Sequence, residues 1–120
     1  MRTVLVLVSL FSFALTTSAS ADENDPRVKR AWKAKCASCH GEDGKGDTEQ
    51  AKKKFGGPLR DLTDAKVQER FKDPELRDMI TKGKTETKDG KEVKMPATPE
   101  IAGEQLDGLV QFVRKLAVKK

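Results

Sequence analysis

The sequence predicts a small all-α domain of about four to five helices, with long loops that wrap around a bound group. Apolar residues recur at helical spacing after Pro26, around Leu76 and over residues 102–117. The stretches 41–57 and 84–99 are rich in glycine or polar residues and lack this spacing, so we expect irregular loops there. Loops of this length in a small domain are ordered only when they pack around something.

The first helix is expected to begin at Pro26 and to run to about Cys36. Asn24 or Asp25 can cap its N-terminus with a side-chain oxygen. Proline suits the first helical position because its missing N–H is not needed there. Val28 and the apolar residues that follow it at helical spacing form the buried face. This helix leads directly into a pair of cysteines.

Two further helices are expected between the long loops. A short helix can begin at Thr63 or Asp64 and extend to Phe71. The next begins at Asp73-Pro74-Glu75, a sequence typical of a first helical turn. Gly83 suits the C-terminal cap of this helix.

The last part of the chain combines an irregular stretch with a strongly amphipathic helix. Asp89-Gly90 can close a small hairpin, although the residues on either side are too polar to favour strands. The final helix covers about residues 102–117. Its expected buried face consists of Leu106, Leu109, Val110, Val113, Leu116 and Ala117.

The first 21 residues predict a cleavable signal peptide. Arg2 supplies a positive charge, residues 4–15 are almost wholly apolar, and Ala19-Ser20-Ala21 has the small-x-small pattern of a cleavage site. The apolar run is too short for a membrane span, which needs about 20 residues. We therefore expect an exported chain, cleaved after Ala21, with one domain over residues 22–120 and no transmembrane segment.

The composition of this domain points to a bound cofactor. It is poor in large aromatic side chains and contains two cysteines. Small domains with such a modest core usually need a disulfide, a metal or a cofactor. Two cysteines are too few for a disulfide scaffold. The formal net charge of the whole chain is +5, a moderate excess that is compatible with an acidic partner.

Residues 36–40 read Cys36-Ala37-Ser38-Cys39-His40, which is the C-x-x-C-H attachment sequence for c-type haem. Two thiols at this spacing can add to the two vinyl groups at one edge of a porphyrin. The next residue then lies beneath the ring, where its imidazole can bind the iron. His40 is the only histidine of the chain. The motif predicts one covalently bound haem c per chain, with His40 as the proximal iron ligand.

Three other uses of this motif compete with haem attachment. A thioredoxin-like redox pair begins a helix in a strand–helix pattern, whereas this pair follows a helix. A structural zinc site needs four ligands, so it would require a carboxylate or a second chain here. A plain disulfide in an oxidising compartment leaves the adjacent histidine unexplained. Haem attachment is preferred because it uses all three residues and agrees with export.

The sixth iron ligand is expected to be Met95. Only Met79 and Met95 remain as methionines after signal cleavage. Met79 shares a predicted apolar helix face with Leu76 and Ile80, which favours a place in the core. Met95 lies in a predicted loop and is followed by a proline. Ligation by His and Met raises the reduction potential and suits an electron carrier.

The sequence resembles the class I cytochromes c, small bacterial relatives of the mitochondrial carrier. The resemblance covers essentially the whole domain and rests on the runs CASCHG at 36–41, GPL at 57–59, KMPA at 94–97 and LVQFVR at 109–114. It implies the small cytochrome c fold around one haem. It also implies that the carbonyl oxygen of Pro58 accepts a hydrogen bond from the free N–H of the histidine ligand.

The resemblance also bears on the crossing of the first and last helices. Members of this family pack an aromatic residue near the position of Trp32 against one like Phe112. They commonly have glycine where this chain has Val28. We therefore expect Val28 to push the two helices apart or to rotate their contact. Other residues expected to pack against the haem or in the core are Phe55, Leu59, Leu76, Ile80, Leu109 and Val113.

These features together predict a periplasmic, monomeric one-electron carrier that is not an enzyme. Two alternatives stay open. One is a haem protein with an open distal site that binds a small ligand or peroxide. The other is a dedicated electron-transfer subunit of one redox enzyme.

The expected partners are redox proteins with acidic docking patches. In the resembled family, lysines ring the exposed haem edge and meet such patches. In this chain the segments expected near the haem are rich in lysine, namely Lys33, Lys35, Lys82, Lys84, Lys91 and Lys94. Nucleic acid is not expected, because the run Lys52-Lys53-Lys54 has no aromatic platform beyond Phe55.

Overall fold

A single helical run leads into the cysteine pair. The computed structural model describes residues 22–118, so the predicted signal peptide lies outside it. The run consists of α1 (Pro26–Ala31), a π-helical turn (Trp32–Cys36) and α2 (Ala37–His40). Asp25 caps its start by accepting a hydrogen bond from the Arg27 amide. The expected end near Cys36 is corrected, because the run continues through the C-x-x-C-H motif.

A second helix, α3 (Glu49–Phe55), lies where the sequence predicted an uninterrupted loop over 41–57. The side chain of Thr48 caps it by accepting from the Ala51 amide at 3.0 Å. Gly56 ends it in the left-handed region, with φ of 73°. The prediction of a loop is therefore wrong for these seven residues.

Two helices follow as the sequence predicted. Helix α4 (Ala65–Glu69) is capped by Asp64, which accepts from the Lys66 amide. Helix α5 (Asp73–Lys82) begins at the predicted Asp-Pro-Glu turn and ends at Gly83. These caps confirm the expected starts of both helices and the end of α5, whereas α4 ends at Glu69, before the expected Phe71.

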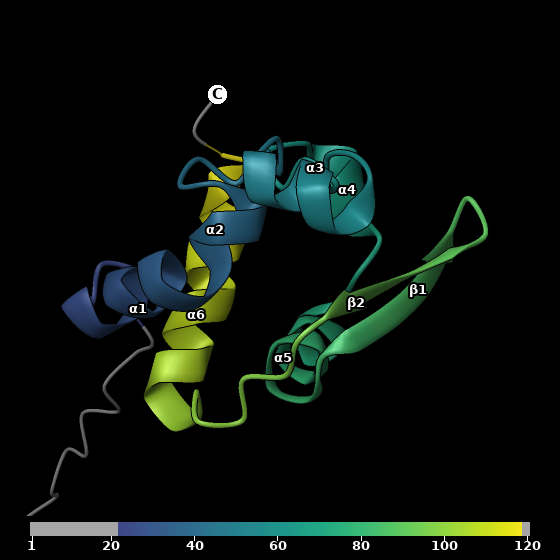
Figure 1. The fold of residues 1–120 in the computed structure, drawn as a ribbon. Helices are drawn as coiled ribbons and strands as arrows, with labels where there is room; N and C mark the ends of the chain where they lie inside the picture. Colours follow the sequence, from purple (N-terminus) through teal and green to yellow (C-terminus); the bar gives the residue numbers. More distant parts are fainter. Residues whose placement is uncertain (1–21, 119–120) are drawn as a thin grey trace, which may run out of the picture.

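The segment after α5 forms a hairpin and not an irregular loop. Strands β1 (Lys84–Lys88) and β2 (Lys91–Met95) pair antiparallel. Asp89 and Gly90 connect them with φ of 51° and 73°, which is the conformation of a type I′ turn. In Figure 1 the hairpin extends away from α5 as an arm. The expectation of irregular structure over 84–99 is corrected for both strands.

The last helix, α6 (Gly103–Leu116), crosses α1, as Figure 1 shows. The rings of Trp32 and Phe112 pack here with their centroids 5.2 Å apart, which confirms the expected aromatic pair. Val28 is fully buried. A Cβ at Gly108 of α6 would lie 2.7 Å from Cγ2 of Val28. The expected displacement of the helices is therefore not needed, because a glycine on α6 leaves room for Val28.

The hydrophobic core lies between the α1–α2 run and α6. Ile80 of α5 and Ile101, just before α6, close it from a second side. Of the residues expected to pack, Leu76 is half-buried against this core, and Phe55 and Leu59 are half-buried outside it. The core residues are Val28, Ala31, Trp32, Ala37, Ile80, Ile101, Leu109, Val110, Val113 and Leu116.

Arg114 fastens the short helices to α6. Its guanidinium donates to the carbonyl oxygens of Gln68 and Phe71 at 2.7 and 2.5 Å and pairs with Asp73 at 2.9 Å. The three bonds connect α6 with the end of α4 and the start of α5. Within residues 22–118, no helix is long and apolar enough to cross a membrane.

Candidate haem site

The two cysteines lie near the end of the first helical run. Cys36 ends the π-helical turn, and Cys39 lies in α2. Residues three apart in a helix project from the same face, and both side chains are free thiols that are half-buried. Burial, and to a smaller extent the neighbouring Cys39, raises the pKa of Cys36 to about 11. Cys36 therefore remains a protonated thiol at neutral pH and is not an activated redox nucleophile.

His40 follows the second cysteine and turns its ring into the molecule. Burial lowers its pKa, because the charged imidazolium is less well solvated than in water. The ring is therefore neutral at pH 7, which is the form that binds a metal. Its Nδ1 atom is buried and has no hydrogen-bond partner, and an unpaired buried polar atom is unfavourable. Nδ1 is thus available as a hydrogen-bond donor to a neighbouring carbonyl, while the other ring nitrogen is the one left for a metal.

Thr48 is a site residue that sequence reasoning missed. Its hydroxyl lies 2.9 Å from the carbonyl oxygen of Ser38 and 3.1 Å from that of Cys39. The same side chain caps α3, so it connects α3 with the cysteine motif. Threonine followed by glutamate is a usual start of a helix, and this signal was present in the sequence.

The loop after His40 is fastened by hydrogen bonds and by glycines. The amide of Gly46 donates to the carbonyl oxygen of His40 at 2.7 Å, and the carbonyl of Gly46 accepts from the Leu59 amide at 2.9 Å. A Cβ at Gly46 would lie 2.8 Å from the carbonyl oxygen of Leu59. Only glycine fits this close approach, so the histidine end of the motif is held against the segment around residue 59.

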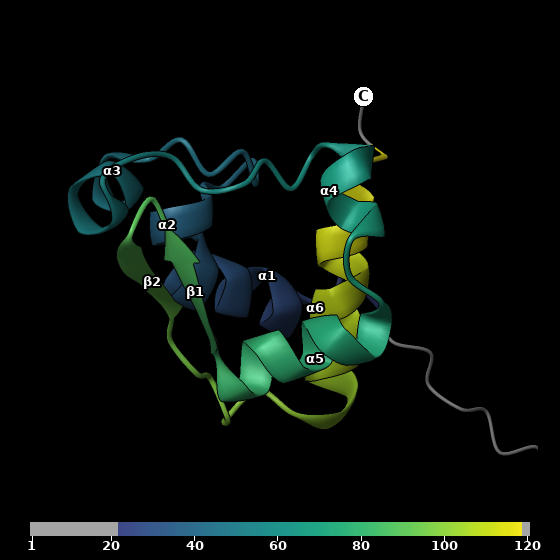
Figure 2. The same ribbon diagram turned by 90° about the vertical axis from the view of Figure 1, so that its right-hand side faces the viewer.

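Met95 is placed by the hairpin and the end of α5. It is the last residue of β2, opposite Lys84, so the expectation that it lies in a loop is corrected. A Cβ at Gly83 would come within 2.5 Å of the carbonyl oxygen of Met95. Beyond Met95, the amide and hydroxyl of Thr98 lie 2.9 and 2.6 Å from the carbonyl oxygen of Ile80. Figure 2 shows the hairpin leaving the end of α5.

Met95 and Met79 are both half-buried, and Met79 lies outside the core cluster. Met95 comes from the hairpin and His40 from α2, two elements that Figure 1 shows on separate sides of the molecule. A sulfur and an imidazole supplied from separate elements suit the two faces of a flat cofactor. The donor set of two thiols, a neutral imidazole and a thioether fits a haem.

Comparison with known proteins gives one family. A sequence model of the cytochrome c family matches residues 27–117. The chain belongs to the cytochrome c family. Its members bind haem c covalently and typically carry electrons, and its fold is the all-α arrangement that the sequence predicted. No curated protein matches the chain.

The structure also bears on the alternative uses of the C-x-x-C-H motif. Among residues 22–118, no group of three or more His, Cys, Asp and Glu side chains could hold a metal ion, which disfavours a structural zinc site. The cysteines follow α1 and the π-helical turn, and no strand precedes them in the described residues. A thioredoxin-like pair is therefore also disfavoured.

Pro58 lies in the segment that is fastened to the loop after His40. Its carbonyl oxygen accepts a hydrogen bond from Nζ of Lys88 at 3.4 Å. Nδ1 of His40 has no partner in the described part of this cytochrome c. The bond between Pro58 and His40 that the resemblance implies therefore stays a prediction.

Proposed function

We propose that this chain is an exported, monohaem c-type cytochrome that carries single electrons between redox partners. Cys36 and Cys39 would hold the haem covalently, with His40 and Met95 as the axial ligands of its iron. One observation carries the proposal: an imidazole that burial keeps neutral directly follows two free thiols on one helical run. The match to the cytochrome c family supports it.

The chemistry that a haem supplies is reversible one-electron transfer at iron. The protein's part is to hold fixed geometry on both sides of the site. Thr48 and Gly46 hold the backbone around Cys39 and His40 by hydrogen bonds, while Gly83 leaves room for the backbone of Met95 to pass close by. Two axial ligands in fixed positions allow little rearrangement between oxidation states. Trp32, packed 6.1 Å from the His40 ring, helps to exclude water.

The wider role follows from the same assignment. We propose an electron carrier and not an enzyme, because electron transfer at a six-coordinate iron requires no general base or nucleophile from the protein. The signal sequence over residues 1–21 supports export to the periplasm, where cytochromes c of this type are typically found. We propose that the carrier is monomeric and meets redox proteins through their acidic patches.

A redox-titrated visible spectrum of the mature protein tests this function. The wild type should give a reversible c-type spectrum and, in the ferric state, the weak far-red band of sulfur-to-iron charge transfer. Met95→Ala should abolish this band and lower the reduction potential, because the thioether favours ferrous iron.

Met79→Leu is the matched control, since it removes the other thioether of the domain and conserves side-chain volume. It should keep both the far-red band and the potential. Loss of the band in Met79→Leu, together with its retention in Met95→Ala, would reverse the ligand assignment. A wild-type ferric spectrum without the band would instead favour an open distal site.

A further inference from the structure

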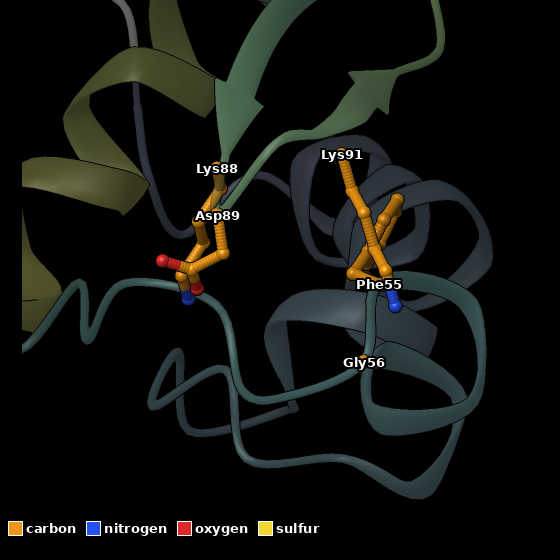
Figure 3. A pocket seen from close by; sticks show the side chains of 5 residues that line it. All are labelled: Phe55, Gly56, Lys88, Asp89 and Lys91. Carbon is orange, nitrogen blue, oxygen red and sulfur yellow. The ribbon is translucent and has the colours of Figure 1, made fainter.

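The hairpin turn meets the end of α3 at a small cavity. The cavity has a volume of about 110 Å³ and is lined by Phe55, Gly56, Lys88, Asp89 and Lys91. Figure 3 shows the side chains of Lys88 and Lys91 extending from the end of the hairpin on either side of this space, toward the turn that carries Phe55 and Gly56. Lys88 also reaches the carbonyl oxygen of Pro58 at 3.4 Å. The turn of the hairpin therefore lies against the segment that follows α3.

Most lysines that the sequence suggested for partner docking are paired within the chain. Their nitrogens lie within 4.0 Å of carboxylate oxygens. The pairs are Lys33 with Glu42, Lys35 with Glu100, Lys82 with Asp78 and Lys84 with Glu86. Only Lys91 and Lys94 of this set form no ion pair in residues 22–118. Four of the six lysines expected at the docking surface thus have a carboxylate close by.

Two unpaired lysines, Lys88 and Lys91, line the cavity, and two more lie on the last turn of the helix that ends there. Lys53 and Lys54, from the last turn of α3, line a neighbouring open hollow, and Nζ of Lys54 lies 5.5 Å from the centre of the Phe55 ring. Lys53, Lys54, Lys88 and Lys91, which we call the basic seam, form no ion pair within the described residues.

The acids near the basic seam compensate its charge only in part. Asp47 and Glu49, beside α3, both pair with Lys52, at 3.0 and 3.4 Å. Asp89 is the one acid among the residues that line the cavity, and it forms no ion pair with the two lysines there. Counting Lys52 with the four lysines of the seam, five cations stand against the three carboxylates of Asp47, Glu49 and Asp89. This positive excess attracts an anion from solution.

The dimensions and walls of the cavity favour a carboxylate on a side chain. A volume of about 110 Å³ holds a carboxylate, a methylene group and a water molecule, since one water takes up about 30 Å³ of liquid. The half-buried ring of Phe55 offers an apolar wall to the methylene group. Nucleic acid is less suited, because Lys54 lies over this ring and leaves no open stacking platform.

We propose that the basic seam is the docking surface for an acidic segment of the redox partner, with one Glu or Asp carboxylate entering the cavity between Lys88 and Lys91. This inference rests on the proposed electron-carrier function and names the surface that it uses. The charges would speed encounter and orient the carrier more than they would prolong the complex. The contact of Lys88 with Pro58 places the seam beside the segment expected to meet His40.

A hexaglutamate peptide tests the inference on the haem-loaded protein. Binding is followed by backbone amide chemical shifts at ionic strengths of about 0.01 M and about 0.15 M, where the Debye lengths are about 30 Å and 8 Å. The chemical-shift changes on peptide binding should concentrate at residues 53–56 and 88–91 and should become markedly smaller at the higher salt concentration. Lys88→Gln with Lys91→Gln should weaken binding about tenfold at low salt.

The matched control is Lys29→Gln with Lys66→Gln, two exposed lysines on α1 and α4 that lose the same charge. This pair should change peptide affinity by less than about twofold. Equal weakening by both pairs, shifts spread over all basic surfaces, or tighter binding of an oligothymidylate than of the peptide would each overturn the inference.

A second readout separates this inference from the proposed function. Reduced wild type and both double variants are oxidised by hexacyanoferrate(III), an anionic acceptor, and by tris(phenanthroline)cobalt(III), a cationic one. Oxidation of all three with unchanged spectra would support the carrier function. The seam variant should be slowed severalfold with the anionic acceptor alone. A seam variant as fast as the control pair would overturn the docking surface and leave the carrier function intact.

Discussion

Gly83 lies close against the backbone of Met95, the proposed sixth ligand. It ends α5 with φ of 77°, and a Cβ there would lie 2.5 Å from the carbonyl oxygen of Met95 and 3.0 Å from the amide nitrogen of Ala97. Both neighbours are backbone atoms and cannot rotate away. Any side chain at this position must therefore move the start of the segment that carries the proposed ligand.

Gly83→Ala should consequently disturb both stability and the iron site. We expect a loss of about 2–5 kcal/mol in the free energy of unfolding, from left-handed backbone strain plus overpacking. The far-red ferric band should weaken or disappear. Gly56→Ala is the control, because Gly56 has φ of 73° and nothing within 4 Å of an added Cβ. It should cost about 1–2 kcal/mol and keep the band. Equal losses and intact bands in both variants would contradict the role of Gly83.

At the scale of single residues, the sequence identified the residues with a chemical role more readily than the contacts that hold them in place. Cys36, Cys39 and His40 were recognisable because their order is dictated by the reaction with a porphyrin edge. Thr48 was not assigned, although its capping signal was visible, because its bonds to the carbonyls of Ser38 and Cys39 depend on how the loop folds back. Such contacts between distant residues require the folded chain.

At the scale of elements, the long periodic helix could be predicted from the sequence, whereas the short or polar elements could not. The final helix was predicted correctly because its apolar spacing extends over fourteen residues. Helix α3 was missed because its seven residues, EQAKKKF, are too short and too charged to show a period. The hairpin depended on an Asp-Gly turn whose flanking strands, KTETK and KEVKM, are mostly polar. These strands pair through the backbone, and Glu86 of β1 is fastened to the segment before α4 by an ion pair with Arg60 at 2.9 Å.

The crossing of α1 and α6 is set by Val28 and Gly108 together. Sequence reasoning considered Val28 alone and expected a displaced helix. The structure places Gly108 where its missing side chain accommodates the valine. The two positions should therefore be energetically coupled.

A double-mutant cycle measures this coupling. Gly108→Ala alone should destabilise by about 1–3 kcal/mol, because its Cβ would lie 2.7 Å from Val28 and 2.9 Å from the carbonyl oxygen of Asp22. In a Val28→Ala background the cost should fall, with a coupling of about 1–2 kcal/mol in denaturant unfolding. Val28→Ala combined with Gly57→Ala should be additive, since Gly57 has nothing within 4 Å of an added Cβ. Additivity in both pairs would show that the crossing does not depend on this contact.

For the whole molecule, the core built from protein alone is small. Its largest fully buried side chains are Leu109, Val28 and Val110. Nε1 of Trp32 and Nδ1 of His40 are buried without hydrogen-bond partners. Within residues 22–118, three helices have more than six residues. A domain of this kind gains a large part of its stability from a covalently bound group.

The cysteine pair therefore tests how far the cofactor stabilises the fold. Cys36→Ala with Cys39→Ala, expressed with its signal sequence, should show no haem on a denaturing gel and should be largely unfolded by circular dichroism. Cys36→Ala alone is the graded control, because Cys39 can still form one thioether while His40 remains available to the iron. It should retain part of the haem and melt between the wild type and the double variant. A double variant that stays helical and melts at the wild-type temperature would show that the protein core, and not the haem, specifies this fold.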